Sequence, residues 1–149
     1  MNPHVTLNGD LVIGLPPQSA LQLFTPEGER GWVPGWAPRY PAGRPSQPDP
    51  GTVFITGDSD ASTTWIVLDR SDTSMRYARV ATGRTAGTVT VTCEPAATAE
   101  ATRVHVRYEL TALETDGALD IAELAADYPG FLAGWRQAIE HAGLASSTR

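Results

Sequence analysis

The period of the apolar residues changes once along this chain, and that change is the strongest constraint on its fold. Between residues 52 and 113 the chain carries runs rich in Val, Thr, Ile and Tyr, in which inward and outward positions alternate. From about Ala118 the apolar residues recur every three to four positions instead. Alternation is typical of half-buried strands, and the longer period is typical of an amphipathic helix. The sequence therefore predicts a sheet followed by one long terminal helix.

Short segments of Gly, Asp, Ser and Pro separate the runs and have the composition of turns. Connections this short require antiparallel neighbours in a meander. A further strand is expected near the N-terminus, where Val5, Leu7, Leu11 and Ile13 alternate with polar residues. The runs predicted as strands after it are 52–57, 63–69, 74–82, 87–94 and 102–113.

Two short helices are expected after the first strand. Pro16 and Pro17 end that strand and favour a first helical turn. Thr25 has the properties of an N-cap, and Pro26 suits the first position of a second helix.

The next segment, 32–50, contains six of the twelve prolines, which favours an irregular loop with one edge strand near residues 36–40. Its two tryptophans are expected to pack back on the body of the protein or to close a cavity.

The C-terminal helix is expected to carry one apolar stripe and a kink. Pro129 and Gly130 interrupt the helical pattern, but the apolar phase continues across them, which favours one kinked helix over two unrelated ones. Residues 145–149 are expected to form a loose tail. The stripe consists of Ile121, Leu124, Tyr128, Phe131, Leu132, Trp135 and Ile139.

Composition excludes several classes of function. The net charge is −6 with no cluster of Lys or Arg, so no nucleic-acid partner is expected, and no apolar run is long enough to span a membrane. The single cysteine, Cys93, and the lack of a visible signal sequence favour a cytoplasmic protein. The three histidines, His4, His105 and His141, lack metal-ligand spacing, so neither a metal nor a cofactor is expected.

The chain also resembles a known superfamily. The stretch 20–30 followed by Trp32 and Trp36, the segment 77–80, and the closing helix 128–135 are similar to bacterial members of the SRPBCC superfamily, which includes START domains, birch-pollen-allergen-like plant proteins and polyketide cyclases. The resemblance implies one α+β domain over residues 1–149 with the helix-grip fold. In this fold a curved seven-stranded antiparallel sheet grips the C-terminal helix and encloses a cavity.

Members of this superfamily mostly bind apolar or amphipathic small molecules, so the cavity is the expected site. Arg79 is the most informative candidate, because alternation places it on the inward face, where a guanidinium needs a partner. The partner is either a ligand anion or, if a bulge turns Arg79 outward, an acidic side chain. The tyrosine hydroxyls serve either a ligand or the backbone. The predicted ligand-binding residues are Trp36, Trp65, Tyr77, Arg79, Cys93, Tyr108, Leu124, Tyr128, Leu132 and Trp135.

Three functions remain open at this point. The favoured one is a protein that holds a hydrophobic small molecule between the sheet and the C-terminal helix. The second is a polyketide cyclase or aromatase, in which Arg79 and a tyrosine polarise a carbonyl group. The third is an interaction domain similar to the activator of the Hsp90 chaperone. A homodimer is also left open. No catalytic motif can be matched, so the chain's status as an enzyme is undecided.

Overall fold

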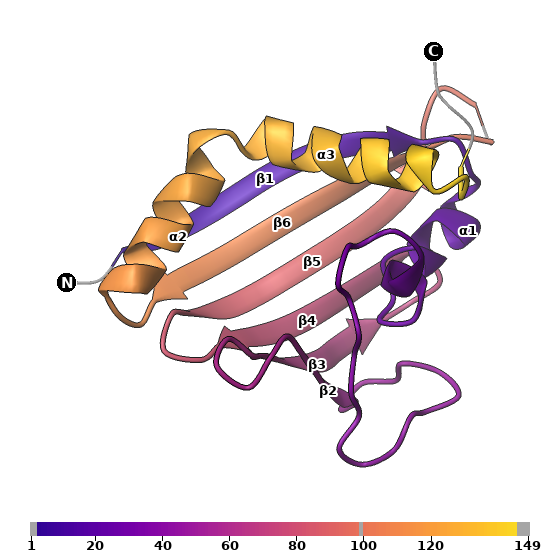
Figure 1. Ribbon diagram of the computed structural model, residues 1–149. Helices are drawn as coiled ribbons and strands as arrows, with labels where there is room; N and C mark the ends of the chain where they lie inside the picture. Colours follow the sequence, from indigo (N-terminus) through magenta and orange to yellow (C-terminus); the bar gives the residue numbers. More distant parts are fainter. Residues whose placement is uncertain (1–2, 99, 146–149) are drawn as a thin grey trace.

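The computed structural model describes residues 3–98 and 100–145. Within them, six strands form one curved antiparallel sheet in the order β1-β6-β5-β4-β3-β2 (Figure 1). The predicted meander is confirmed from β2 to β6, and the N-terminal strand closes the sheet by pairing with β6. The strands are β1 (His4–Ile13), β2 (Val53–Thr56), β3 (Thr63–Arg70), β4 (Ser74–Ala81), β5 (Thr85–Pro95) and β6 (Thr102–Ala112).

The helices lie on the concave side of this sheet (Figure 1). Helix α1 (Pro17–Gln22) and the 3-10 turn η1 (Gly28–Gly31) follow β1, and helices α2 (Thr115–Ala126) and α3 (Tyr128–His141) follow β6. This is the α+β helix-grip arrangement that the resemblance implied. None of the described helices is both long and apolar enough to cross a membrane.

The expected seventh strand is wrong for the described residues. The proline-rich loop makes one isolated bridge, between Arg39 and Ile55, in place of an edge strand near residues 36–40. Arg39 and Ile55 exchange both backbone hydrogen bonds, at 2.9 Å each. Pro38 and Pro41 flank this position and have no amide hydrogen to donate, so the ladder cannot extend along β2.

The predicted kink in the C-terminal helix is a complete break. Asp127 has a non-helical backbone (φ −150°, ψ 64°) and separates α2 from α3. Its carboxylate accepts a hydrogen bond of 3.0 Å from the amide of Gly130 and so caps α3. Pro129 then occupies the first turn of α3, where a missing amide hydrogen costs nothing. The apolar stripe still packs into the core on both sides of the break, except for Phe131, which is 37% exposed.

Two expectations about the ends of helices change in detail. Thr25 does accept a hydrogen bond from the amide of Gly28, as an N-cap would, but the element that follows is a 3-10 turn, not an α-helix. Of the expected loose tail, residues 146–149 lie outside the described residues. Ala145 is described, and it packs against the hydrophobic core.

Helix α3 approaches the sheet closely because β1 carries a glycine beneath it. A Cβ atom at Gly9 would lie 2.7 Å from Cδ1 of Leu132 and 3.1 Å from the ring of Tyr128. Leu132 is 1% exposed as a result. The close approach seals one part of the concave face.

Candidate ligand-binding site on the concave face

The two ends of the concave face differ in burial. At the end that carries the β3–β4 turn, which we call the Met75 end, the inward side chains are at most 3% exposed. At the end that carries the β4–β5 turn, which we call the Arg79 end, several inward side chains are only half-buried. The Met75 end consists of Met75, Val91, Cys93, Val104 and Val106, and the Arg79 end consists of Trp65, Arg79, Gly87 and Tyr108.

Arg79 lies on the inward face, as predicted. Strand register places it between Trp65 of β3 and Gly87 of β5. Its guanidinium carbon is 5.3 Å from the ring centroid of Trp65, within the range of a cation–π interaction. One terminal nitrogen donates a hydrogen bond of 3.2 Å to the hydroxyl of Thr85. The register shift in β3 occurs between Val67 and Asp69, so it does not turn Arg79 outward.

The guanidinium of Arg79 is incompletely paired. Its Nε is the only buried side-chain nitrogen or oxygen among the described residues that has no hydrogen-bond partner. No described carboxylate lies within ion-pair distance of it. Burial lowers the pKa of Arg79, while the charges of Tyr108 and Asp120 act in the opposite direction. An arginine nevertheless stays charged in proteins. The Arg79 end therefore holds a cation with a free donor.

Gly87 lies beside this cation at a point where the backbone of β6 comes very close. It lies next to Arg79 in the register and contributes no side chain to the face. A larger residue is excluded, because a Cβ atom there would lie 1.8 Å from the carbonyl oxygen of Glu109. The backbone of β6 thus occupies the position that a side chain at residue 87 would take.

The three predicted tyrosines differ in how their hydroxyls are used. Tyr77 donates to the carbonyl oxygen of Phe24 at 2.9 Å, and Tyr128 donates to that of Val106 at 2.8 Å. The hydroxyl of Tyr108 has no hydrogen bond to any described residue. Burial raises the pKa of all three phenols. Tyr108 is therefore the one tyrosine of the three with a hydroxyl left for a ligand.

The aromatic residues of the site form two groups. Trp65 stacks on Phe54 with ring centroids 5.8 Å apart and meets the edge of Trp36 at the same distance. On the helix side, Tyr108 meets Trp135 of α3 at 6.4 Å. The indole nitrogens of Trp36 and Trp65 donate to Pro26 and Thr56, so they are satisfied within the protein. These rings can offer a ligand their faces and edges.

The structure brings together only part of the predicted set. Trp65, Tyr77, Arg79, Tyr108 and Trp135 lie at or next to the Arg79 end, and Trp36 backs Trp65. Cys93 belongs to the sealed Met75 end, where burial raises its pKa to about 12. Leu132 and Tyr128 are sealed against β1 and have no free polar group.

A groove of about 440 Å³ lies at the inner bend between α2 and α3. Leu124 and Phe131 are its apolar walls, and the Phe131 ring lies 6.1 Å from that of Tyr108. Three carboxylates complete its lining, from Asp120, Glu123 and Asp127. Through Phe131, the groove borders the ring of Tyr108.

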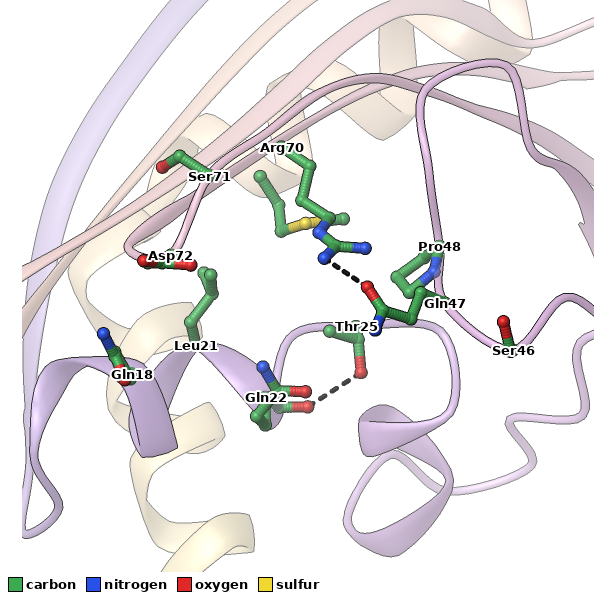
Figure 2. Close-up of a pocket in the computed structure, with 11 residues that line it drawn as sticks. Gln18, Leu21, Gln22, Thr25, Ser46, Gln47, Pro48, Arg70, Ser71 and Asp72 are labelled. Carbon is green, nitrogen blue, oxygen red and sulfur yellow. Dashed lines mark hydrogen bonds between the residues drawn. The ribbon is translucent and has the colours of Figure 1, made fainter.

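A second pocket, of about 250 Å³, lies at the opposite end of the sheet between α1 and the β3–β4 turn (Figure 2). Leu21 and Met75, both buried, form its floor. Arg70 points into it, but its guanidinium is already bonded to Gln47 and Asp49. Arg70 is already paired, and Leu21 and Met75 close the bottom of this pocket. Among the described residues, the pocket contains no fully buried polar side-chain atom that lacks a hydrogen bond.

Glu29 is a titratable residue that the sequence reasoning did not single out. It belongs to η1 and is half-buried, and its charge raises the pKa of both Tyr77 and Tyr108. No periodicity assigns the faces of a four-residue turn, so only its position between two short apolar segments could have indicated it.

The described residues contain no group of three or more His, Cys, Asp or Glu side chains that could hold a metal ion. Binding at the Arg79 end would rest on the guanidinium, a phenol and aromatic rings.

No protein-family model and no curated protein matches the chain, but solved structures are similar to it. An uncharacterised protein from Rhizobium leguminosarum is 14% identical with a TM-score of 0.67, over 95% of this chain and 97% of its own. Ara h 8.0201 is 13% identical with a TM-score of 0.63, over 91% of this chain and 97% of its own. Norcoclaurine synthase from Thalictrum flavum was solved with dopamine and hydroxybenzaldehyde. It is 10% identical with a TM-score of 0.64, over 99% of this chain and 91% of its own. The chain thus shares the helix-grip fold of these structures, and the expected α+β fold class is confirmed.

Proposed function

We propose that this protein binds an apolar or aromatic small molecule that carries an anionic oxygen, and that Arg79 holds that oxygen. The observation that carries the proposal is the buried Nε of Arg79, which has no partner among the described residues. A buried donor without a partner costs about 1–3 kcal/mol, and more when it is charged. An anionic ligand would remove that cost by accepting the free hydrogen bond.

The surroundings of Arg79 support the apolar part of the ligand. Trp65, Tyr108 and Trp135 are half-buried, so their rings keep surface that a ligand can cover. An apolar site with few polar groups is the usual composition of a small-molecule pocket. One structural neighbour, norcoclaurine synthase, was solved with two small aromatic molecules, so the same fold accommodates such ligands there.

Two fluorescent dyes test the proposal. The first, 1-anilinonaphthalene-8-sulfonate, is aromatic and anionic, and the second, N-phenyl-1-naphthylamine, has the same rings without the charge. We expect Arg79→Met to weaken binding of the anionic dye at least tenfold, because the charged hydrogen bond is lost. Binding of the neutral dye should change less than twofold.

Arg103→Met is the matched control, because Arg103 is exposed on the outer side of β6. This variant should bind both dyes as the unaltered protein does. Equal affinity of the Arg79→Met variant and the unaltered protein for the anionic dye would refute the proposed role of Arg79. Failure of the unaltered protein to bind either dye would refute ligand binding at this site.

Catalysis of the polyketide-cyclase kind is the second candidate, and the free hydroxyl of Tyr108 favours it. Arg79 and Tyr108 could both donate to one carbonyl oxygen and stabilise an enolate. Turnover of a β-polyketone analogue that is lost in both Arg79→Met and Tyr108→Phe would favour the enzyme. Binding of the analogue without turnover would favour the carrier.

A further inference from the structure

The three nitrogens of the Arg79 guanidinium are used unequally by the protein. Nη1 donates the hydrogen bond of 3.2 Å to the hydroxyl of Thr85, whereas Nε is buried without a partner. Nη2 has no hydrogen bond to any described residue either, yet it is not among the fully buried atoms that lack a partner. It therefore keeps solvent-accessible surface. The free donors of Arg79 are thus Nε and Nη2.

Covalent geometry places these two donors side by side. Nη1 is the terminal nitrogen on the same side of the Nε–Cζ bond as Cδ, so the N–H of Nε is parallel to one N–H of Nη2. The two form one edge of the planar guanidinium, directly opposite Nη1. A carboxylate binds to such an edge with two parallel hydrogen bonds, one to each oxygen. The part of Arg79 that the protein leaves free is therefore the part that matches a carboxylate.

Neighbouring residues hold this edge in a fixed orientation. The Trp65 ring lies over the guanidinium, with its centroid 5.3 Å from Cζ, and its indole nitrogen is itself bonded to Thr56 at 2.9 Å. Thr85, which holds Nη1, belongs to β5 and is 3% exposed. A guanidinium that is held on one face and at one corner loses little further freedom when an anion binds. Its free edge is therefore preorganised.

The surroundings of the free edge favour an anion with a single negative charge. No described residue forms a salt bridge with Arg79, so its charge is left for the ligand. The half-buried residues beside it, Trp65 and Tyr108, are aromatic. A carboxylate would balance the one positive charge, whereas a phosphate dianion would place a second, uncompensated charge beside these rings.

We infer that the anionic group of the ligand is a carboxylate, held side-on by Nε and Nη2 of Arg79, and not a phenolate or an enolate. The inference rests on the proposed function, because Arg79 must first be the residue that binds the anion. An anion with a single oxygen faces two parallel donors and cannot align with both. An enolate is also the anion that a cyclase would stabilise, so a carboxylate at this edge favours the carrier over the enzyme.

Two aromatic anions of similar size test the inference by isothermal titration calorimetry. The anion 4-cyanobenzoate has two anionic oxygens and 4-cyanophenolate has one, and both are ionised at a pH above the pKa of the phenol. We expect the unaltered protein to bind 4-cyanobenzoate roughly tenfold more tightly, as one further charge-assisted hydrogen bond would give. Arg79→Lys keeps the charge but lacks the paired donors, so its affinities for the two anions should differ by less than about twofold. Arg103→Lys, at an exposed position on β6, is the matched control and should keep the preference.

Nuclear magnetic resonance identifies the nitrogen that binds. The Nε–H signal of Arg79 is the one that is absent from the spectrum of Arg79→Lys. Addition of 4-cyanobenzoate should move the proton of this signal downfield, because Nε then donates to an anionic oxygen. The neutral amide 4-cyanobenzamide has the same shape without the charge and should leave the signal in place.

The outcomes distinguish the two proposals. If the unaltered protein binds neither anion, or if Arg79→Met binds both as tightly as the unaltered protein does, the proposed function fails. If both anions bind equally and through Arg79, only the inference of a carboxylate fails. A preference for 4-cyanobenzoate that persists in Arg79→Lys also overturns the inference, as does an Nε–H signal that binding of 4-cyanobenzoate leaves unmoved.

Discussion

The Met75 end and the Arg79 end of the concave face are formed by the same strands but differ in what covers them. At the Met75 end, α1 and α3 press on the sheet, and the inward residues are aliphatic and sealed. At the Arg79 end, Trp65, Arg79 and Tyr108 are large, partly polar and half-buried. One end thus serves to stabilise the fold, while the other keeps groups that the fold leaves unsatisfied. The difference predicts that substitutions at the two ends will have opposite effects on stability.

The largest effect is expected at the sealed end. Leu132→Ala should lower the free energy of unfolding by about 2–5 kcal/mol, because α3 is held against Gly9 and cannot collapse into the void. Urea denaturation followed by tryptophan fluorescence measures this loss. A loss below about 1 kcal/mol would mean that this end is not close-packed, and the contrast between the ends would disappear.

At the Arg79 end, a substitution is expected to raise the free energy of unfolding. Arg79→Met should raise the free energy of unfolding by about 1 kcal/mol, because a buried donor without a partner is replaced by an apolar side chain of similar length. The same denaturation experiment applies, with Arg103→Met as the control. Destabilisation by Arg79→Met would show that Trp65 and Thr85 already satisfy the guanidinium.

The pH dependence of the free energy of unfolding tests whether Glu29 is buried in the folded protein. Its pKa is raised in the folded state, so ionisation lowers the free energy of unfolding as the pH rises from about 4.5 toward the raised pKa. Glu29→Gln cannot ionise, so its stability advantage over the unaltered protein should grow over that interval and then level off. Thermal unfolding at several pH values measures it. A difference that is constant with pH would place the carboxylate in solvent.

The smallest effects are expected for single hydroxyl groups. Tyr128→Phe should cost about 1 kcal/mol, because it leaves the carbonyl oxygen of Val106 without that hydrogen bond. Tyr108→Phe should change stability by less than about 0.5 kcal/mol, since its hydroxyl has no partner among the described residues. Thermal denaturation of the two variants side by side gives the comparison. Equal losses would indicate that Tyr108 has a hydrogen bond that keeps it from a ligand.

The sequence predicted the fold well because alternation and helical period respond directly to burial on one face. The stripe from Ile121 to Ile139 packs into the core as expected except at the exposed Phe131, and Arg79 lies on the inward face by simple alternation. The prediction of a seventh strand was wrong because the two prolines beside Arg39 prevent further ladder hydrogen bonds, although the other residues there suit a strand.

The candidate site was predicted less completely, because a pattern gives the face of a residue and not the depth of its cover. Cys93 and Leu132 share the face of Arg79, yet the close approach of α3 and the packing of the Met75 end seal them. Alternation also does not distinguish the three tyrosines. Tyr77 and Tyr128 donate hydrogen bonds to carbonyl groups that are distant in the sequence, whereas the hydroxyl of Tyr108 has no partner among the described residues. Glu29 lies in a turn without any period, so the sequence pattern assigns it no face.

The pairing of β1 with β6 has a consequence for the order in which this protein can be assembled. The side chains of His4 and Thr111 meet across 107 positions of sequence. At a synthesis rate of about 5–20 residues per second, β1 waits roughly 5–20 seconds for its partner strand to be made. During that interval β2 to β5 can pair with their neighbours, but the sheet has no place for β1. The pairing of β1 with β6 is therefore the last step in forming the sheet. Contacts between residues this far apart in the sequence form slowly.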